Sequence, residues 1–202
     1  EILPFLDRLA REGEVPMLYV SHALDEVMRL ADHLVLMEDG RVIASGGTTR
    51  VTADPALARI AGEAARGGVL DLLVTGLPDG DGLLELAVGQ GRLRLAAGPT
   101  PPPPDSMMRL RVAARDVALA LDGAALDAAG LSIRNRLPCR VTAVTQEADG
   151  LVAVALEIEG TDTDGGESGR LLARITPAAA RDLGLEPGRP VLALIKTLAL
   201  GT

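Results

Sequence analysis

Three short polar segments near the end of the chain carry the residue types that bind small anions. Arginine and lysine supply positive charge, serine and threonine hydroxyls donate hydrogen bonds, and backbone N–H groups at a helix start point in one direction. A tetrahedral oxyanion with two negative charges needs groups of all three kinds. The segments therefore predict an oxyanion site with these residues: Ser132, Ile133, Arg134, Asn135, Thr176, Ala179, Lys196 and Thr197.

Lys196 is the sharpest indication of such a site. The chain has 20 basic residues, and all of them except Lys196 are arginines. A compact ammonium group on a flexible stem fits a small anion pocket in which a guanidinium fork is too bulky. The alternative is a lysine that only extends from a strand edge into solvent. Because Ser-x-Arg-Asn occurs in the same region, we interpret Lys196 as an anion ligand.

His22 is a second candidate for chemistry, because it follows an apolar segment and stands at the start of a helix. A Ser-His pair at such a place is, on its own, more typical of helix capping. The whole stretch 18–46, however, resembles the switch-histidine region of ABC transporter ATPases, including the hairpin sequence Leu36-Met37-Glu38-Asp39-Gly40-Arg41-Val42. In that family the histidine reaches the γ-phosphate of ATP, so the resemblance gives His22 a catalytic role.

The chain departs from that family in three motifs. It has no Gly-x-x-x-x-Gly-Lys-Ser/Thr loop to hold phosphates, no Leu-Ser-Gly-Gly-Gln signature, and no acidic strand end to position magnesium. Those motifs are expected upstream of Glu1. Residues 1–202 are therefore not expected to be an enzyme, and ATP with Mg²⁺ is expected only in a full-length parent. With one cysteine and two histidines, no metal site is expected either.

The three polar segments, in their order along residues 131–202, resemble the Mop (TOBE) domain. This barrel occurs in molybdate-importer ATPase subunits, molybdate-responsive repressors and small storage proteins. The resemblance implies that molybdate or tungstate is the bound ligand. It also implies a homodimer through the C-terminal barrels, because the anion of that family lies between two subunits. Some members carry a serine shortly after the threonine, where this chain has Ala178 and Ala179, and a backbone N–H is one possible replacement.

The elements that must position these residues follow from hydrophobic periodicity. Up to residue 66 the sequence predicts helices at 2–12, after Ser21-His22 and at 55–65, a strand at 15–20, and a hairpin of 34–37 with 42–44. After Gly67-Gly68, short runs separated by glycine turns predict strands at 70–74, 83–88, 93–96, 110–113, 117–121, 137–145, 151–159, 171–175 and 191–198, with a helix at 177–183.

This order predicts the fold class and its domains. We expect an α/β remnant of an ABC ATPase domain, followed by all-β OB-like (Mop/TOBE) barrels with a short helix. The domains are 1–66, the end of the ATPase domain; 67–130, an OB-like regulatory β subdomain; and 131–202, the oxyanion-binding barrel. Three strands, a helix and a further strand form the order of a small OB-like barrel.

Composition limits the partners. The formal net charge of -8 gives no basic surface for nucleic acid. An OB-type nucleic-acid binder also needs stacking aromatic residues, but Phe5 and Tyr19 both lie outside the predicted barrels. No apolar run approaches the roughly 20 residues that cross a bilayer. Any membrane role is therefore expected through a permease subunit, which implies a cytoplasmic chain, peripheral on the inner face of the cell membrane.

Together these inferences predict the molybdate- or tungstate-binding regulatory region of an importer's ATP-binding subunit, in which binding inhibits transport. The inhibition is implied by the family resemblance alone. The alternative is the OB-like tail of a sugar- or polyamine-type importer ATPase that docks a protein partner. A molybdate titration separates the two, because the alternative predicts no binding.

Overall fold

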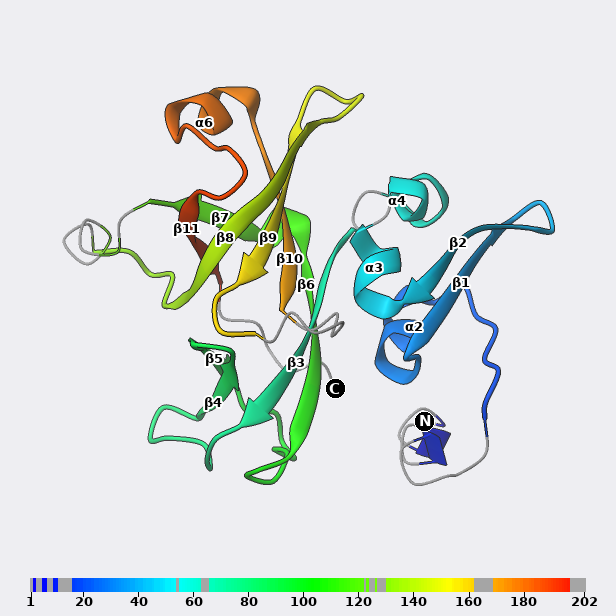
Figure 1. The fold of residues 1–202 in the computed structure, drawn as a ribbon. Coiled ribbons are helices and arrows are strands. Elements are labelled where there is room, and N and C mark those ends of the chain that lie inside the picture. The colour runs from blue at the N-terminus through cyan, green and yellow to red at the C-terminus, as the bar shows by residue number, and fades with distance from the viewer. Residues whose placement is uncertain are drawn as a thin grey trace. The chain divides into compact units, whose positions relative to one another are not determined.

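The chain divides into two compact units, Glu1–Arg66 and Gly67–Thr202 (Figure 1). The structure, a computed structural model, describes residues 2, 5–6, 9–10, 16–53, 55–62, 66–121, 123, 126, 130–161 and 169–196. Most of the helix predicted at 2–12 and most of the connector 122–130 lie outside the described residues, as do 162–168 and Thr197.

The elements of the first unit with described bounds are a hairpin and short helices. Its elements are α2 (Leu24–Leu30), β1 (His33–Glu38), β2 (Arg41–Gly47), α3 (Thr48–Ala53) and α4 (Pro55–Ala61). β1 and β2 pair antiparallel around Asp39 and Gly40, whose φ angles of 49° and 75° are both positive. An Asp-Gly turn tolerates these angles, so the predicted hairpin is confirmed.

Two predictions for this unit need correction. Residues 16–20 form no strand, and Leu18 and Val20 are 92% and 87% exposed. A strand needs a neighbour for its backbone hydrogen bonds, and the sheet described in this unit has only β1 and β2. The single helix predicted at 55–65 is also different: α3 precedes it, and α4 ends before Gly62, whose φ is 81°.

The second unit is mainly β structure, and its strands lie within a few residues of the predicted ones. Its first part contains β3 (Gly67–Val74), β4 (Leu83–Val88), β5 (Gly91–Ala96), β6 (Met107–Ala113), the 3-10 turn η2 (Ala114–Asp116) and β7 (Val117–Ala120). Its second part contains β8 (Asn135–Gln146), β9 (Val152–Ile158), β10 (Arg170–Ile175), α6 (Pro177–Asp182) and β11 (Pro190–Ile195).

All nine strands of the second unit belong to one curled, OB-like sheet. The strand order is β10-β9-β8-β5-β4-β3-β6, and β11 pairs with both β7 and β8 (Figure 1). The β5–β8 and β7–β11 pairs therefore join the segments that the sequence divides at residue 130. The division of this unit into two domains stays a prediction.

One apolar core fills this sheet. It contains leucines and valines from the first part, such as Leu72 and Leu86, and equally buried residues of the second, such as Leu137 and Val154. The free Cys139 lies in the same core, and burial raises the pKa of its thiol to about 12. The thiol is therefore protonated at neutral pH and acts as a small hydrophobic side chain.

Two turns also bring the parts of this unit together. The N–H of Gln90, in the β4–β5 turn, donates to the Glu159 carbonyl oxygen at 2.8 Å. Beside it, Gly89 has a φ of 51°, and a Cβ added there would lie 2.5 Å from the same oxygen. Only glycine allows this approach, because a methyl group needs about 3.4 Å from an oxygen.

We predict that Gly89→Ala destabilises the protein more than Gly82→Ala does. Both glycines have positive φ, but the added Cβ of Gly82 meets nothing within 4 Å. The control substitution therefore costs about 1 kcal/mol of unfolding free energy, from backbone conformation alone. Gly89→Ala adds backbone overlap and should cost about 2–4 kcal/mol. Urea denaturation measures both, and equal losses would contradict the close packing of the two turns.

Candidate oxyanion site

Arg134 and Lys196 each follow or precede a residue of the same strand pair. Ile195, the last residue of β11, pairs with Asn135, the first residue of β8. Arg134 and Lys196 each lie one residue beyond this pair, on adjoining antiparallel segments. Opposite residues on such segments share a face and have Cβ atoms about 5 Å apart. Both Arg134 and Lys196 are exposed, whereas Asn135 and Ile195 are each 1% exposed.

Ser132 and Ile133 come directly before this arginine. Ser132 is exposed and Ile133 is half-buried. Among the described residues, none forms a hydrogen bond or ion pair with the side chain of Ser132, Arg134 or Lys196. We call Ser132–Arg134 with Lys196 the lysine end. It combines two positive charges with one free hydroxyl group at the surface.

Thr176 and Ala179 lie at the other end of the same strands. Ile175, the last residue of β10, pairs with Val152 of β9, and Val152 pairs with Gln146, the last residue of β8. The twelve-residue strand β8 therefore separates Thr176 from Asn135 (Figure 1). Such a strand spans on the order of 30 Å. We call Thr176 and Ala179 the threonine end; one small anion cannot contact both ends of one chain.

Thr176 caps helix α6 and thereby uses one of the expected backbone donors. Its Oγ1 accepts a hydrogen bond from the N–H of Ala179 at 3.2 Å, and its carbonyl oxygen accepts from Ala180 at 3.1 Å. Pro177 has no N–H, so in the described part of the chain only Ala178 keeps an unpaired N–H in this turn. The Ala179 N–H is thus already paired in this conformation, and its role in the site stays a prediction. The Thr176 hydroxyl keeps its proton for donation.

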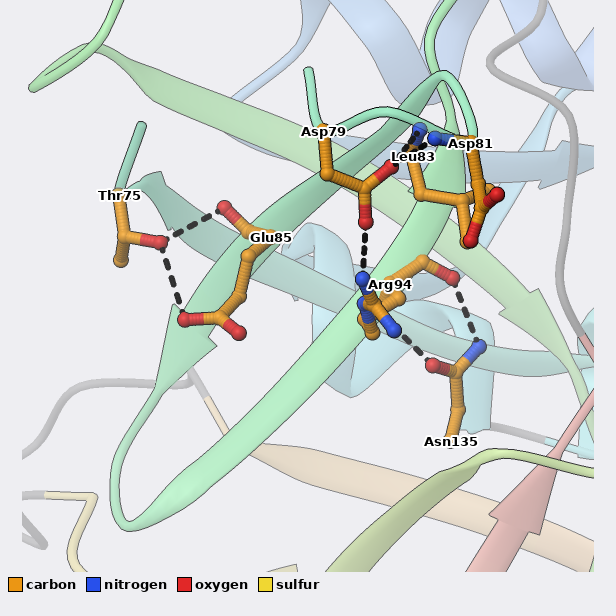
Figure 2. Close-up of polar contacts among 7 residues, drawn as sticks. All are labelled: Thr75, Asp79, Asp81, Leu83, Glu85, Arg94 and Asn135. Carbon is orange, nitrogen blue, oxygen red and sulfur yellow. Dashed lines mark hydrogen bonds and ion pairs between the residues drawn. The ribbon is translucent and has the colours of Figure 1, made fainter. Parts of the chain in front are cut away.

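Asn135 joins two strands through its side chain. Its Oδ1 accepts from the backbone N–H of Arg94 at 2.7 Å, and its Nδ2 donates to the Arg94 carbonyl oxygen at 3.1 Å. Figure 2 shows this pair beside the ion pair of Arg94 with Asp79. The Asn135 side chain is buried and both ends of its amide are paired in this conformation, so its role as an anion ligand stays a prediction.

Asp79 fixes the turn next to this pair. Its Oδ1 accepts hydrogen bonds from the N–H groups of Leu83, at 2.9 Å, and Asp81, at 3.0 Å. These bonds, above all the one from Leu83, lower the pKa of Asp79, and the charge of Arg94 acts in the same direction. The carboxylate therefore stays ionised and holds both the β3–β4 turn and β5.

A second group of charges, which the sequence did not suggest, supports the threonine end. Arg174 Nε donates to Glu147 Oε2 at 2.7 Å, and the same guanidinium pairs with Asp149. The side chains of Arg174 and Glu147 are only 10% and 12% exposed. The pKa of Asp149 is lowered, first by the N–H of Leu151 and then by Arg174. These contacts attach the β8–β9 turn to β10, two residues before Thr176.

His22 lies in a turn that hydrogen bonds of neighbouring side chains stabilise. The hydroxyl of Ser21 accepts from the Ala23 N–H at 3.0 Å and donates to Glu26 at 3.3 Å. Tyr19 donates to the same carboxylate at 2.8 Å, which raises the pKa of Tyr19. His22 itself is exposed, with no hydrogen-bond partner in the ranges that the structure covers. Its imidazole is therefore free to meet a ligand supplied from elsewhere.

Two further searches cover the described residues alone. No cluster of three or more His, Cys, Asp or Glu side chains there is arranged to hold a metal ion. Every helix there is too short or too polar to span a bilayer.

Residues 131–199, which include the strands that carry both ends of the site, match the family model of the TOBE domain. The chain is 41% identical, over 99% of its length, to the molybdenum import ATP-binding protein ModC of Rhodospirillum rubrum. The protein of the same name from Paramagnetospirillum magneticum is 40% identical over the same share. The chain covers 52% and 51% of these relatives, and it is homologous to their C-terminal half.

A solved structure is also similar to part of the chain. It is the cytoplasmic molybdate-binding protein ModG with molybdate bound, at 25% identity and a TM-score of 0.48. The similarity covers 64% of this chain and 89% of that chain.

We predict that Asn135→Ala destabilises the fold. The substitution leaves the part-buried N–H and C=O of Arg94 without their Asn135 partners, which should cost about 1–3 kcal/mol of unfolding free energy. The matched control is Ser132→Ala, an exposed position three residues earlier, which should change stability by less than about 0.5 kcal/mol. Urea denaturation of both variants tests this prediction. If the Asn135→Ala protein is as stable as the control, the hydrogen bonds between Asn135 and Arg94 do not stabilise the fold.

Proposed function

We propose that this chain is the regulatory region of the ATP-binding subunit of a molybdate ABC importer, and that it binds molybdate or tungstate. The observation that supports the proposal is the pairing of Ile195 with Asn135, because the exposed Lys196 and Arg134 each come one residue beyond that pair. In a chain with a net charge of -8, two adjoining cations without ion pairs are unusual. Each attracts a unit negative charge at 4 Å with about 4 kcal/mol at an effective dielectric of 20, before desolvation.

The anion site forms between two chains. A ligand held by the lysine end and by the Thr176 hydroxyl must take these groups from different copies, because β8 separates them within one chain. A two-fold homodimer of the C-terminal barrels supplies the lysine end of one copy and the threonine end of the other. Its symmetry gives two equivalent sites. Ser132 and Arg134 contact the ligand from the first copy, and Thr197 follows Lys196 on the same segment.

The first unit extends the proposal to the parent protein. Residues 1–66 are the end of an ABC ATPase domain, with His22 as its switch histidine. In the full-length protein this histidine meets ATP with Mg²⁺, which motifs upstream of Glu1 hold. The parent acts with a membrane permease subunit on the cytoplasmic side of the membrane. When cytoplasmic molybdate is plentiful, its binding to the C-terminal barrels inhibits further import.

The first test is calorimetric titration of the chain with molybdate. We expect binding, and we expect Lys196→Ala and Arg134→Ala each to weaken it at least about tenfold, because each removes a charge–charge contact. Arg41→Ala, an exposed arginine of the other unit, is the control and should bind as the unchanged chain does. Absence of binding would favour a tail that docks a protein partner. Equal affinities in all variants would remove the site assignment.

The second test addresses the shared site. A Lys196→Ala chain and a Thr176→Ala chain should each bind poorly alone. After unfolding and refolding together, half of the dimers are mixed, and each mixed dimer has one site with both ends intact. About a quarter of the normal number of sites should therefore return. If both ends acted within one chain, mixing would restore nothing. Thr176→Ser, which keeps the hydroxyl, should bind nearly normally.

A further inference from the structure

One side chain attaches the start of β8 to β5. Among the described residues, the register of these two strands contains a single pair, Arg92 with Arg136. Beyond that pair, the Asn135 amide accepts from the N–H of Arg94 at 2.7 Å and donates to the Arg94 carbonyl oxygen at 3.1 Å. An amide side chain carries both a donor and an acceptor, as a peptide group does. The Asn135 amide therefore takes the place of a strand partner for Arg94.

Asn135 also adjoins both cations of the lysine end. It follows Arg134 directly in the chain, and its register partner Ile195 directly precedes Lys196. A shift of Asn135 therefore moves Arg134 through the peptide bond between them and moves Lys196 through the strand pair. Because Asn135 is 1% exposed and lies in close packing, it cannot shift far unless Arg94 moves as well.

Asp79 holds Arg94 in place from the β3–β4 turn (Figure 2). Its Oδ2 pairs with Nη2 of the Arg94 guanidinium, while its Oδ1 accepts from the N–H groups of Leu83 and Asp81. The side chains of Asp79 and Arg94 are 33% and 47% exposed, so water screens this ion pair less than it screens a fully exposed one. One carboxylate therefore joins the β3–β4 turn to the residue that Asn135 binds.

We propose, on the basis of the proposed function, that Asp79 is a positioning residue that sets the affinity of the oxyanion site through Arg94 and Asn135. The ion pair fixes the end of β5, the Arg94 backbone fixes the Asn135 amide, and this amide fixes the strand pair next to the lysine end. The first part of the second unit thereby regulates the ligand affinity of the second part.

The sign of the effect distinguishes positioning from charge. The negative charge of Asp79 repels an anion, so removal of that charge alone would tighten anion binding. A positioning role predicts the opposite result. Without the ion pair, the cations of the lysine end lose their fixed geometry, and the affinity falls although a repelling charge has been removed.

The test compares Asp79→Asn with Asp81→Asn in the full chain. Asparagine keeps an Oδ1 that accepts from the two N–H groups of the turn, but its NH2 group cannot accept from Arg94. The turn is therefore kept and the ion pair is lost. Asp81 lies two residues away in the same turn, and its carboxylate contacts no partner among the described residues. Calorimetric titration gives the molybdate affinities, and urea denaturation gives the stabilities.

We expect Asp79→Asn to weaken molybdate binding about three- to tenfold. Asp81→Asn should leave the affinity unchanged or slightly higher, since it removes the same charge without breaking a contact. Two further variants test the ion pair from its other side, without any change in the turn. Arg94→Lys keeps the ion pair and should bind nearly as the unchanged chain does, whereas Arg94→Gln should bind more weakly. Asp79→Asn combined with Arg94→Gln should bind as Arg94→Gln alone does, because both substitutions break one contact.

Three outcomes would contradict these proposals. Equal or tighter molybdate binding by Asp79→Asn, while the unchanged chain binds, overturns the positioning role and leaves the site assignment intact. An equally large loss of affinity in Asp81→Asn, or in Arg94→Lys as in Arg94→Gln, also overturns the role of the ion pair. Lack of molybdate binding by the unchanged chain overturns both the positioning role and the site assignment.

Discussion

The pairing of Ile195 with two neighbours at once is the constraint on which the lysine end depends. A residue in the middle of a sheet has its position fixed from both sides, because its backbone donors and acceptors must be satisfied by adjoining strands. Val117 on one side and Asn135 on the other therefore determine where the chain leaves the sheet. Register has a period of two, so a slip of one residue would move Lys196 into the core and Ile195 to the surface. Burial of Ile195 thus fixes the exposed lysine.

Contacts between the two parts of the second unit help to fix the pairing of Ile195 with its two neighbours. The Asn135 amide binds the backbone of Arg94, and Gln90 binds the carbonyl oxygen of Glu159. Both contacts attach the β4–β5 hairpin to the strands that carry the site. Neither contact is apolar, so each demands a specific geometry that hydrophobic packing alone does not impose. The first part of the unit therefore acts as a support that holds β8 in one position.

The sequence predicted the elements well where their pattern is local. Alternation in residues such as Val152 and Val154 determined β9, and Asp39-Gly40 predicted the hairpin turn, because these signals need only near neighbours. The role of Asn135 could not be predicted, since its partner Arg94 lies 41 residues away in the sequence. The strand predicted at 15–20 is wrong for a related reason. A strand depends on a neighbouring strand that its own sequence does not specify, and residues 16–20 form none.

The same limit applies to the proposed site. Residue types near Lys196 indicated an oxyanion, and the register was needed to show that the strand pair next to Arg134 and Lys196 lies at the other end of β8 from Thr176. Arg174 is a cation that is not available to bind an anion, because it already forms ion pairs with Glu147 and Asp149. A count of cations in the sequence would include it as a ligand.

The separation of the lysine and threonine ends has a consequence for regulation. A ligand that needs groups from two chains binds only when those chains adopt one relative arrangement. Its binding free energy therefore stabilises that arrangement and no other. By linkage, any other event that favours the same arrangement of chains tightens anion binding, and anion binding favours that event by the same factor. In the proposed dimer each site would adjoin a buried, strand-paired residue, so the coupling would pass through rigid elements. A dimeric oxyanion site of the proposed kind is thereby suited to sense the ligand and to transmit its binding.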